Sequence, residues 1–225
     1  MMKKTIVIFA DSVKHGQHCI AGKEILTKQW VRPVSNQGGG ALSDAQVCYK
    51  NIYGTFSVKL LQKMEIEFLF HAPQLNQPEN YVVKAGTWTQ CFNLTLNEID
   101  SYLDDPHILW NIGSSSSYGL NDRISIELIE RGSIVINQSL YLIKPENVKF
   151  IVSVNYNNNK RIRVSFNYKG YNYNLATTDP IIWKWLENED IGTEHISGHE
   201  DILCISLGES FNDGYCYKLV ASAFF

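Results

Sequence analysis

Residues 161–175 read RIRVSFNYKGYNYNL, and this stretch decides the fold class. Apolar residues occupy every second position from Ile162 to Tyr168, and basic or polar residues occupy the positions between them. This period of two is that of a strand with one buried face. Lys169 and Gly170 follow as a two-residue turn, and residues 171–175 return with the same period. The stretch therefore predicts a β-hairpin.

Short strand signals continue on both sides of this hairpin. Apolar or alternating runs predict strands at residues 5–9, 30–34, 81–83, 124–128, 134–136, 140–143, 150–156, 203–207 and 215–225, and residues 55–70 predict two strands or one long bent strand. Residues 94–110 have helical spacing interrupted by Pro106, and Asp179-Pro180 can cap a short helix over residues 181–186. Many short strands with one small helix per half favour a mainly β protein built from small barrels.

Length and composition fit a packed protein. The chain has 225 residues, of which 44% are apolar and 12 are tyrosines, so it can form one large core or two ordinary ones. Aromatic residues also favour sheet. No run of about 18 apolar residues occurs, and residues 5–10 are too short for the core of a signal peptide. We therefore expect a cytoplasmic protein without a membrane segment.

Charge is unevenly distributed along the chain. The net charge of −3 argues against a protein that coats duplex DNA by charge alone. Residues 1–40 hold six Lys or Arg against two Asp or Glu, and residues 144–173 hold six against one. Residues 176–213 hold one base against nine acids. Two basic stretches thus lie in an otherwise acidic chain.

Several motifs together resemble the dual OB-containing domain family of bacteria and archaea. They are ADSVKHGQHCIAG (residues 10–22), WVRPVS (30–35), QPENY (77–81), and SLGE (206–209) with YCYKL (215–219). Their order spans almost the whole chain, although Gln17 stands where a second glycine is expected after Gly16. The resemblance implies two tandem oligonucleotide/oligosaccharide-binding (OB) barrels, which we assign to residues 1–138, with inserted loops and a short helix, and residues 139–225.

The resemblance also implies a function. Members of this family are often associated with anti-phage conflict systems and are suspected of sensing nucleic acids or nucleotides. No catalytic residues can be carried over from the family. We therefore expect a non-catalytic binding or sensing module in a prokaryotic defence system, whose partners are single-stranded nucleic acid or a nucleotide and a defence-system protein.

The first candidate ligand surface lies between residues 14 and 32. It combines cationic side chains with a flat ring, as a groove for single-stranded nucleic acid requires, because cations offset phosphate charge and aromatic rings stack with bases. The alternative is a solvated loop beside a core tryptophan. The candidate residues are Lys14, His15, His18, Lys23, Trp30 and Arg32.

The second candidate surface is the hairpin itself. On a barrel face, arginines could follow a phosphate backbone while tyrosines stack with bases. Strict alternation also fits a solvent-facing basic strand with no ligand. The candidate residues are Arg161, Arg163, Tyr171 and Tyr173.

Metal binding and catalysis have weaker signals. His15, His18 and Cys19 could suggest zinc, but no second pair with metal spacing accompanies them, so we expect no metal and no cofactor. Gly38 to Gly40 lacks the lysine of a phosphate-binding loop, and no catalytic motif is present. Lys23 and Glu24 near His15 could still form an acid/base set, which keeps a nucleotide hydrolase or nuclease open as an alternative. Another alternative is an adaptor subunit whose acidic C-terminal stretch docks a partner.

Overall fold

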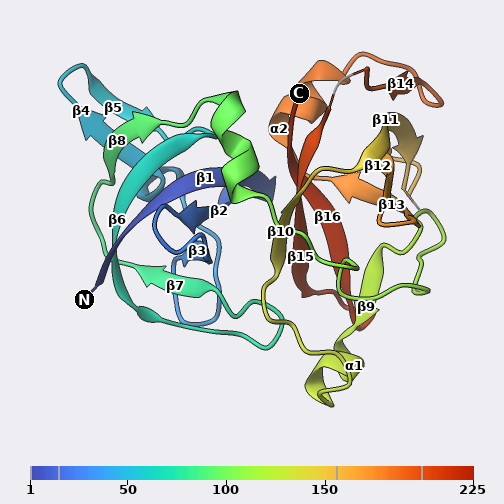
Figure 1. Ribbon diagram of the computed structural model, residues 1–225, viewed down its shortest axis with the longest axis horizontal. Coiled ribbons are helices and arrows are strands. Elements are labelled where there is room, and N and C mark those ends of the chain that lie inside the picture. Colours follow the sequence, from blue (N-terminus) through green and yellow to red (C-terminus); the bar gives the residue numbers. More distant parts are fainter. Residues whose placement is uncertain (1, 15, 156, 199) are drawn as a thin grey trace. The chain divides into compact units, whose positions relative to one another are not determined.

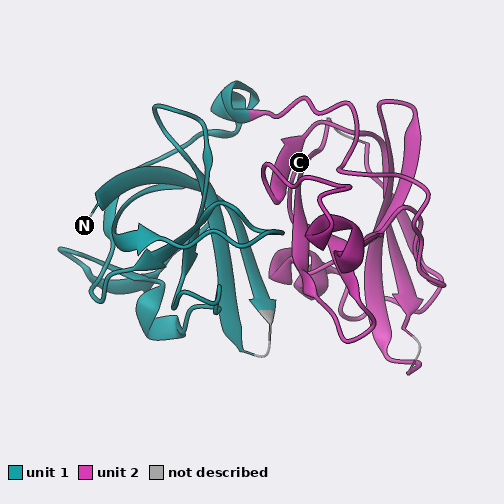
Figure 2. Ribbon diagram, turned by 90° about the horizontal axis from the view of Figure 1, so that it is seen from below, with its two compact units in different colours: residues 1–102 teal, residues 103–225 magenta. Residues whose placement is uncertain are grey.

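The computed structural model describes residues 2–14, 16–155, 157–198 and 200–225. The chain folds into two compact units, residues 1–102 and residues 103–225 (Figure 1, Figure 2). Each unit has its own buried apolar core and is built mainly from strands, as the sequence predicts. Residues 103–138, which the sequence analysis assigned to the first barrel, belong to the second unit.

Five strands of the first unit close into a barrel. The order is β1-β2-β3-β7-β6, and β6 pairs again with β1. β3 and β7 are parallel, whereas the other neighbours in the ring are antiparallel. This is the five-stranded Greek-key barrel of an OB fold. The bounds are β1 Met2–Lys14, β2 Gln17–Glu24, β3 Trp30–Val34, β6 Gln62–His71 and β7 Asn80–Val83.

The long connection from β3 to β6 packs against this barrel. It contains the 3₁₀ helix η1 Asp44–Gln46 and the hairpin of β4 Cys48–Asn51 and β5 Gly54–Ser57. Leu42, Val47 and Tyr49 from this connection join the core of the first unit. β8 Thr89–Asn93 pairs with β6, and η2 Leu96–Tyr102 ends the unit.

Gly22 allows β1 and β2 to approach closely within this barrel. A Cβ atom at this position would lie 2.2 Å from the carbonyl oxygen of Val7. Such a contact is far inside the van der Waals limit, and the obstructing atom belongs to the backbone. Only glycine therefore fits at this crossing of the two strands.

The second unit has the same strand topology as the first, with additional strands. The order is β10-β15-β16-β13-β12-β11-β14, and β9 pairs with β16. β13 and β16 are parallel, as β3 and β7 are in the first unit. The bounds are β9 Arg123–Ser125, β10 Leu140–Ile143, β11 Glu146–Val154, β12 Lys160–Tyr168, β13 Tyr171–Thr177, β14 Glu194–Ile196, β15 Ile202–Ser210 and β16 Tyr215–Phe224.

The first strand of the second barrel is interrupted at Lys144 and Pro145. In the first unit, the start of β1 pairs with β6 and its remainder pairs with β2. In the second unit two strands take the place of β1. β10 pairs with β15, and β11 pairs with β12. Proline has no N–H for a ladder hydrogen bond, so the strand breaks there. The ring is completed by the chain itself across Pro145.

Two short helices belong to the second unit. They are α1 Ile126–Glu130 and α2 Pro180–Trp185. Asp179 caps α2 as predicted, because its side chain accepts a hydrogen bond from the amide of Ile181. Ile182 and Leu186 pack into the core between the strands. No helix in the described part of the chain is long and apolar enough to cross a membrane.

Some local elements differ from the sequence prediction. The predicted strand at residues 124–128 divides into β9 and α1, and residues 134–136 are not a strand. Within residues 94–110, the helix is limited to η2. Residues 55–70 form two strands. Residues 11–17, which follow the predicted strand at residues 5–9, are also largely strand, because β1 extends to Lys14 and β2 begins at Gln17.

Candidate nucleotide or nucleic-acid interface

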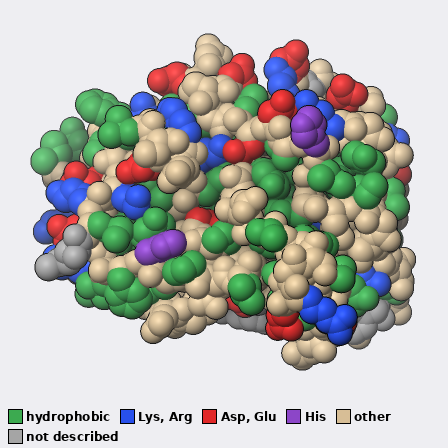
Figure 3. All heavy atoms as spheres, turned by 60° about the horizontal axis from the view of Figure 1, so that its bottom comes forward, with side chains coloured by type: hydrophobic (Ala, Val, Ile, Leu, Met, Phe, Trp, Pro, Cys, Tyr) green, Lys and Arg blue, Asp and Glu red, His purple; other side chains and the backbone are tan. Residues whose placement is uncertain are grey.

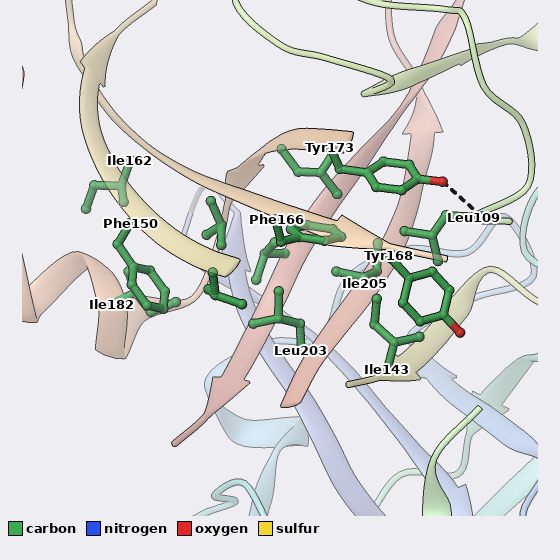
Figure 4. Close-up of a cluster of buried hydrophobic side chains, with 14 of the residues drawn as sticks. Leu109, Ile143, Phe150, Ile162, Phe166, Tyr168, Tyr173, Ile182, Leu203 and Ile205 are labelled. Carbon is green, nitrogen blue, oxygen red and sulfur yellow. Dashed lines mark hydrogen bonds between the residues drawn. The ribbon is translucent and has the colours of Figure 1, made fainter. Parts of the chain in front are cut away.

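The predicted hairpin is present as β12 and β13, but its arginines and tyrosines lie on opposite faces. Phe166 pairs with Tyr173, and both belong to the core of the second unit (Figure 4). Arg163 pairs with Ala176 on the outer face. Strand alternation forces this separation, since the residues between core positions point outward. The hairpin therefore does not bring its arginines and tyrosines together on one face.

The two tyrosines differ in exposure. Tyr173 is fully buried, and its hydroxyl oxygen accepts a hydrogen bond of 3.4 Å from the amide of Leu109 (Figure 4). Tyr171 lies at the turn end of the hairpin opposite Tyr168 and is 37% exposed. Tyr171 is thus the tyrosine of this pair whose ring is open to solvent.

Arg163 is buried on the outer face of the hairpin. Its Nη2 lies 3.2 Å from Asp122 Oδ2 and donates to the backbone oxygen of Asn174 at 2.6 Å, and its Nε donates to Asn174 Oδ1 at 2.9 Å. Burial lowers the pKa of Arg163, and the charge of Asp122 opposes that effect. The guanidinium stays protonated, because arginine does not lose its proton in proteins. Arg161 lies half-buried two residues earlier on β12.

A chain segment crosses the outer face of the hairpin above Arg163. We call residues 111–122 the strap. The backbone of Leu120 exchanges hydrogen bonds of 3.2 and 3.0 Å with that of Asn174, and Asn121 Nδ2 donates to the backbone oxygen of Asn172 at 2.9 Å. Asp122 also accepts hydrogen bonds from the amide and hydroxyl of Ser116. The strap is therefore fixed to the hairpin mainly by polar contacts.

Lys218 on β16 is a second buried cation in this region. It is 1% exposed, its Nζ donates to the backbone oxygen of Asn111 at 2.6 Å, and its backbone amide donates to the backbone oxygen of Asp122 at 2.8 Å. Burial lowers the pKa of Lys218 to about 7, and the negative charge of Asp122 opposes that shift. The Nζ also lies 5.5 Å from the ring centroid of Tyr173.

The sequence analysis did not select Lys218, Asp122 or Asn174. A signal for Lys218 was present, because it alternates with Cys216 and Val220 along a strand. Both of these neighbours are buried, so the lysine shares their inward-facing register. No comparable sequence pattern marks Asp122, which lies in an irregular segment far from its partner Arg163 in the chain.

The cations selected in the first unit are also buried. Lys23 donates from Nζ to the backbone oxygen of Tyr102 at 2.7 Å and lies 5.1 Å from the ring centroid of Trp30. Arg32 Nε donates to Glu79 Oε1 at 3.3 Å. Trp30 is only 5% exposed. His15 and the side chain of Lys14 lie outside the described residues.

His18 lies between two carboxylates. Its Nδ1 is 2.8 Å from Asp11 Oδ1, and its Nε2 is 3.1 Å from Asp44 Oδ1. Partial burial lowers the pKa of His18, but the hydrogen bonds and charges of Asp11 and Asp44 outweigh it, so the pKa is raised above its ordinary value of 6.5. Each ring nitrogen thus lies within hydrogen-bonding distance of a carboxylate, an arrangement that favours the doubly protonated imidazolium. Among the described residues, no group of three His, Cys, Asp or Glu could hold a metal ion.

The glycine run at residues 38–40 directs its amides to its own turn. The amides of Gly38 and Gly40 donate to Asn36 Oδ1 at 2.9 and 3.4 Å, and that of Gly39 donates to the Asn36 backbone oxygen at 3.1 Å. A phosphate-binding loop presents such N–H groups to its ligand. The amides of this run are instead used within the loop.

Charged side chains are scattered over the face of the molecule that Figure 3 shows. On the face in Figure 3, Lys and Arg side chains are interspersed with acidic and apolar ones and form no continuous stripe. The outer face of β12 and β13 instead offers polar groups with defined geometry, namely Arg161, Arg163, Ser165, Asn167, Asn172 and Asn174. Guanidinium and amide groups of this kind suit phosphates and base edges.

Comparison with known proteins identifies one family. The model of the dual OB-containing domain matches residues 4–223, which is nearly the whole chain. Neither the curated proteins nor the solved structures include a significant match. The motifs quoted from the sequence lie within the matched range.

Proposed function

Because the chain belongs to the dual OB-containing domain family, we propose that it is a non-catalytic binding module for nucleotides or single-stranded nucleic acid. OB barrels bind such ligands on strands 2 and 3 and on the adjoining loops. The corresponding strands of the second unit are β12 and β13. Their outer face, with Arg163 bonded to Asn174, is the observation that carries the proposal.

The burial of the cations favours a ligand with few phosphates. Lys23, Arg32 and Arg163 are all buried, and the chain has a net charge of −3. A polymer bound along its backbone would need several exposed cations and would give a steep dependence of affinity on salt. A nucleotide or a short oligonucleotide needs only one or two charge contacts, supplemented by hydrogen bonds to its base.

Titration with defined ligands tests this proposal. Mononucleotides, dinucleotides and oligonucleotides of DNA and RNA are titrated at 50 and 200 mM salt, conditions between which six to ten phosphate contacts would cost about 10³–10⁵ in affinity. We expect binding of small ligands with less than about a tenfold change, which corresponds to one or two phosphate contacts.

A matched pair of variants locates the site. Arg161→Gln removes the half-buried arginine of the outer face, and Arg131→Gln removes an exposed arginine that pairs with Glu127 on α1. Only the first substitution should weaken binding. Absence of binding for DNA, RNA and free nucleotides at low salt contradicts the proposal.

A second candidate function is an adaptor in a prokaryotic defence complex. Trp185 and Phe225 are half exposed, with ring centroids 6.1 Å apart, and Ile181, one helical turn before Trp185 on α2, is 59% exposed. Exposed apolar groups of this kind are typical of protein interaction sites. Acidic residues follow Trp185 in the chain at Glu187, Glu189, Asp190 and Glu194. This surface favours a partner protein with basic and apolar side chains.

Co-purification tests the adaptor function. The chain is expressed together with the products of its neighbouring genes, with Ile181→Asp as the interface variant and Val135→Asp as a control at another exposed apolar residue. A partner retained by the control but lost in Ile181→Asp supports the adaptor. Equal retention by both variants contradicts a role for this surface.

A further inference from the structure

Three charged side chains are buried together in the second unit, and their charges do not balance. Arg163, Lys218 and Asp122 are each less than a tenth exposed. Asp122 is paired with Arg163 at 3.2 Å, and its charge also acts on Lys218. Below about pH 7, where Lys218 is protonated, two cations therefore share one buried carboxylate. Buried charges are costly unless they are paired, so a second negative charge would be favourable here.

The strap that carries Asp122 has few apolar anchors. Its large apolar side chains, Ile112, Tyr118 and Leu120, are between 44% and 47% exposed. Ile124 just beyond the strap is fully buried in a core cluster. A segment held by polar contacts between better anchored ends can open locally at a low free-energy cost. Opening the strap would remove Asp122 from Arg163 and leave β12, β13 and β16 in place.

Gly119 shows how closely the strap fits over the ion pair. A Cβ atom on Gly119 would lie 1.9 Å from Asp122 Oδ2 and 2.2 Å from Arg163 Nη2. The backbone of the strap thus lies directly against the charged groups. The same crowding means that a methyl group at this position displaces the strap or the ion pair without changing any charge.

We propose that the strap covers a phosphate-binding site formed by Arg163 and Lys218, in which the Asp122 carboxylate occupies the position of a ligand phosphate. This inference rests on the proposed function and assigns its ligand contacts to the second barrel. A phosphate group carries more charge than a carboxylate and, like a carboxylate, accepts hydrogen bonds from a guanidinium. A phosphate-bearing ligand therefore displaces Asp122, and Asn174 stays beside Arg163 on the opened face.

Binding of two probes to charge and steric variants tests the proposal. The probes are inorganic pyrophosphate and a five-nucleotide oligothymidylate. Asp122→Asn removes the competing charge but keeps a side chain that can bond to Ser116, and Gly119→Ala displaces the strap sterically. Both variants should bind the probes at least tenfold more tightly than the wild type. Glu130→Gln, which removes an exposed acid on α1, is the matched control and should leave affinity unchanged.

A double variant and amide exchange identify the site. Adding Arg163→Gln to Asp122→Asn should abolish the gain, with circular dichroism verifying that both proteins fold. In the wild type, saturating pyrophosphate should speed hydrogen exchange at the amides of Leu120 and Asn174, whose hydrogen bonds join the strap to β13. A purely structural ion pair would produce neither result.

The outcomes separate the two proposals. If the wild type binds nucleotides and Asp122→Asn binds the probes no better, the strap proposal is overturned and the proposed function stands. A gain that Glu130→Gln shares, or that survives Arg163→Gln, also overturns the strap proposal. Binding by Asp122→Asn that is absent from the wild type supports it. Failure of every variant to bind either probe or any nucleotide overturns both proposals.

Discussion

His18 illustrates how single residues respond to a setting that the sequence does not reveal. The sequence selected it as a cation for a ligand, whereas both of its ring nitrogens lie within hydrogen-bonding distance of carboxylates. Asp44 approaches from η1, which the local sequence around His18 cannot indicate. Residue type predicted the charge of this position, but its partners depend on the fold.

The raised pKa of His18 predicts a pH-dependent stability. A folded-state pKa above the ordinary 6.5 means that the folded state holds its proton more tightly than the unfolded state. The stabilisation is therefore fully present below about pH 6.5 and is lost as pH rises through the folded-state pKa. His18→Gln should lower the free energy of unfolding by roughly 0.5 kcal/mol at pH 6, the scale of a partly exposed ion pair, and by less at pH 9. Urea denaturation at both pH values measures this difference, and an equal loss at both contradicts the assignment.

Lys218 predicts the opposite trend. Its folded-state pKa of about 7 lies below the ordinary 10.5, so between these values the unfolded state binds more protons. Its contribution to stability therefore rises from about pH 7 to about pH 10.5, with a slope of at most about 1.4 kcal/mol per pH unit. Lys218→Met should lack this rise when unfolding is followed from pH 7 to 10. Parallel curves for the wild type and Lys218→Met would show that the lysine titrates normally.

At the scale of the element, the hairpin of β12 and β13 was predictable and its neighbours were less so. Alternation and the Lys169-Gly170 turn are local signals, and the strands formed where they indicate. Residues 134–136 carry a similar apolar signal but form no strand, and the amide of Ile134 instead donates to the backbone oxygen of Leu128. The pairing of residues across the turn decides on which face of the hairpin each tyrosine lies. The sequence analysis did not consider that pairing. Burial of Arg163 depends on the distant strap and could not be predicted locally.

The crossing of β1 and β2 makes a testable prediction at this scale. Gly22→Ala should lower the free energy of unfolding by about 3 kcal/mol, because the new methyl group meets the Val7 carbonyl and the strands must separate. Gly198→Ala is the matched control, since a Cβ atom there has no heavy atom within 4 Å. Thermal unfolding of the two variants measures the difference. Similar melting temperatures would mean that β1 and β2 adjust without cost.

At the scale of the molecule, the division into two barrels followed from strand spacing and family resemblance, but the boundary did not. The sequence indicated a division after residue 138, whereas the compact units meet at residues 102 and 103. The intervening segment contains the strap and β9, and β9 pairs with β16 of the second unit. Pairing between segments so distant in the chain leaves no local trace in composition or periodicity.

Two fragments test where the second unit begins. Residues 103–225 keep the Asp122–Arg163 pair, the β9–β16 pairing and the core residues Leu109 and Ile124. A fragment of residues 139–225 lacks all of these. It also lacks Asn111, whose backbone oxygen accepts a hydrogen bond from Lys218. We expect the longer fragment to resist proteolysis and unfold cooperatively, and the shorter one to be at least about 3 kcal/mol less stable. Equal stability would mean that residues 103–138 are dispensable for the barrel.

The proline between β10 and β11 gives the second barrel a seam that the first lacks. β1 is continuous, so pulling its start away from β6 strains the hydrogen bonds of its remainder with β2. Pro145 has no N–H to continue the ladder, so the four residues of β10 bond to β15 separately from the bonds between β11 and β12. The second barrel therefore divides between two short strands the pairing that one continuous strand provides in the first.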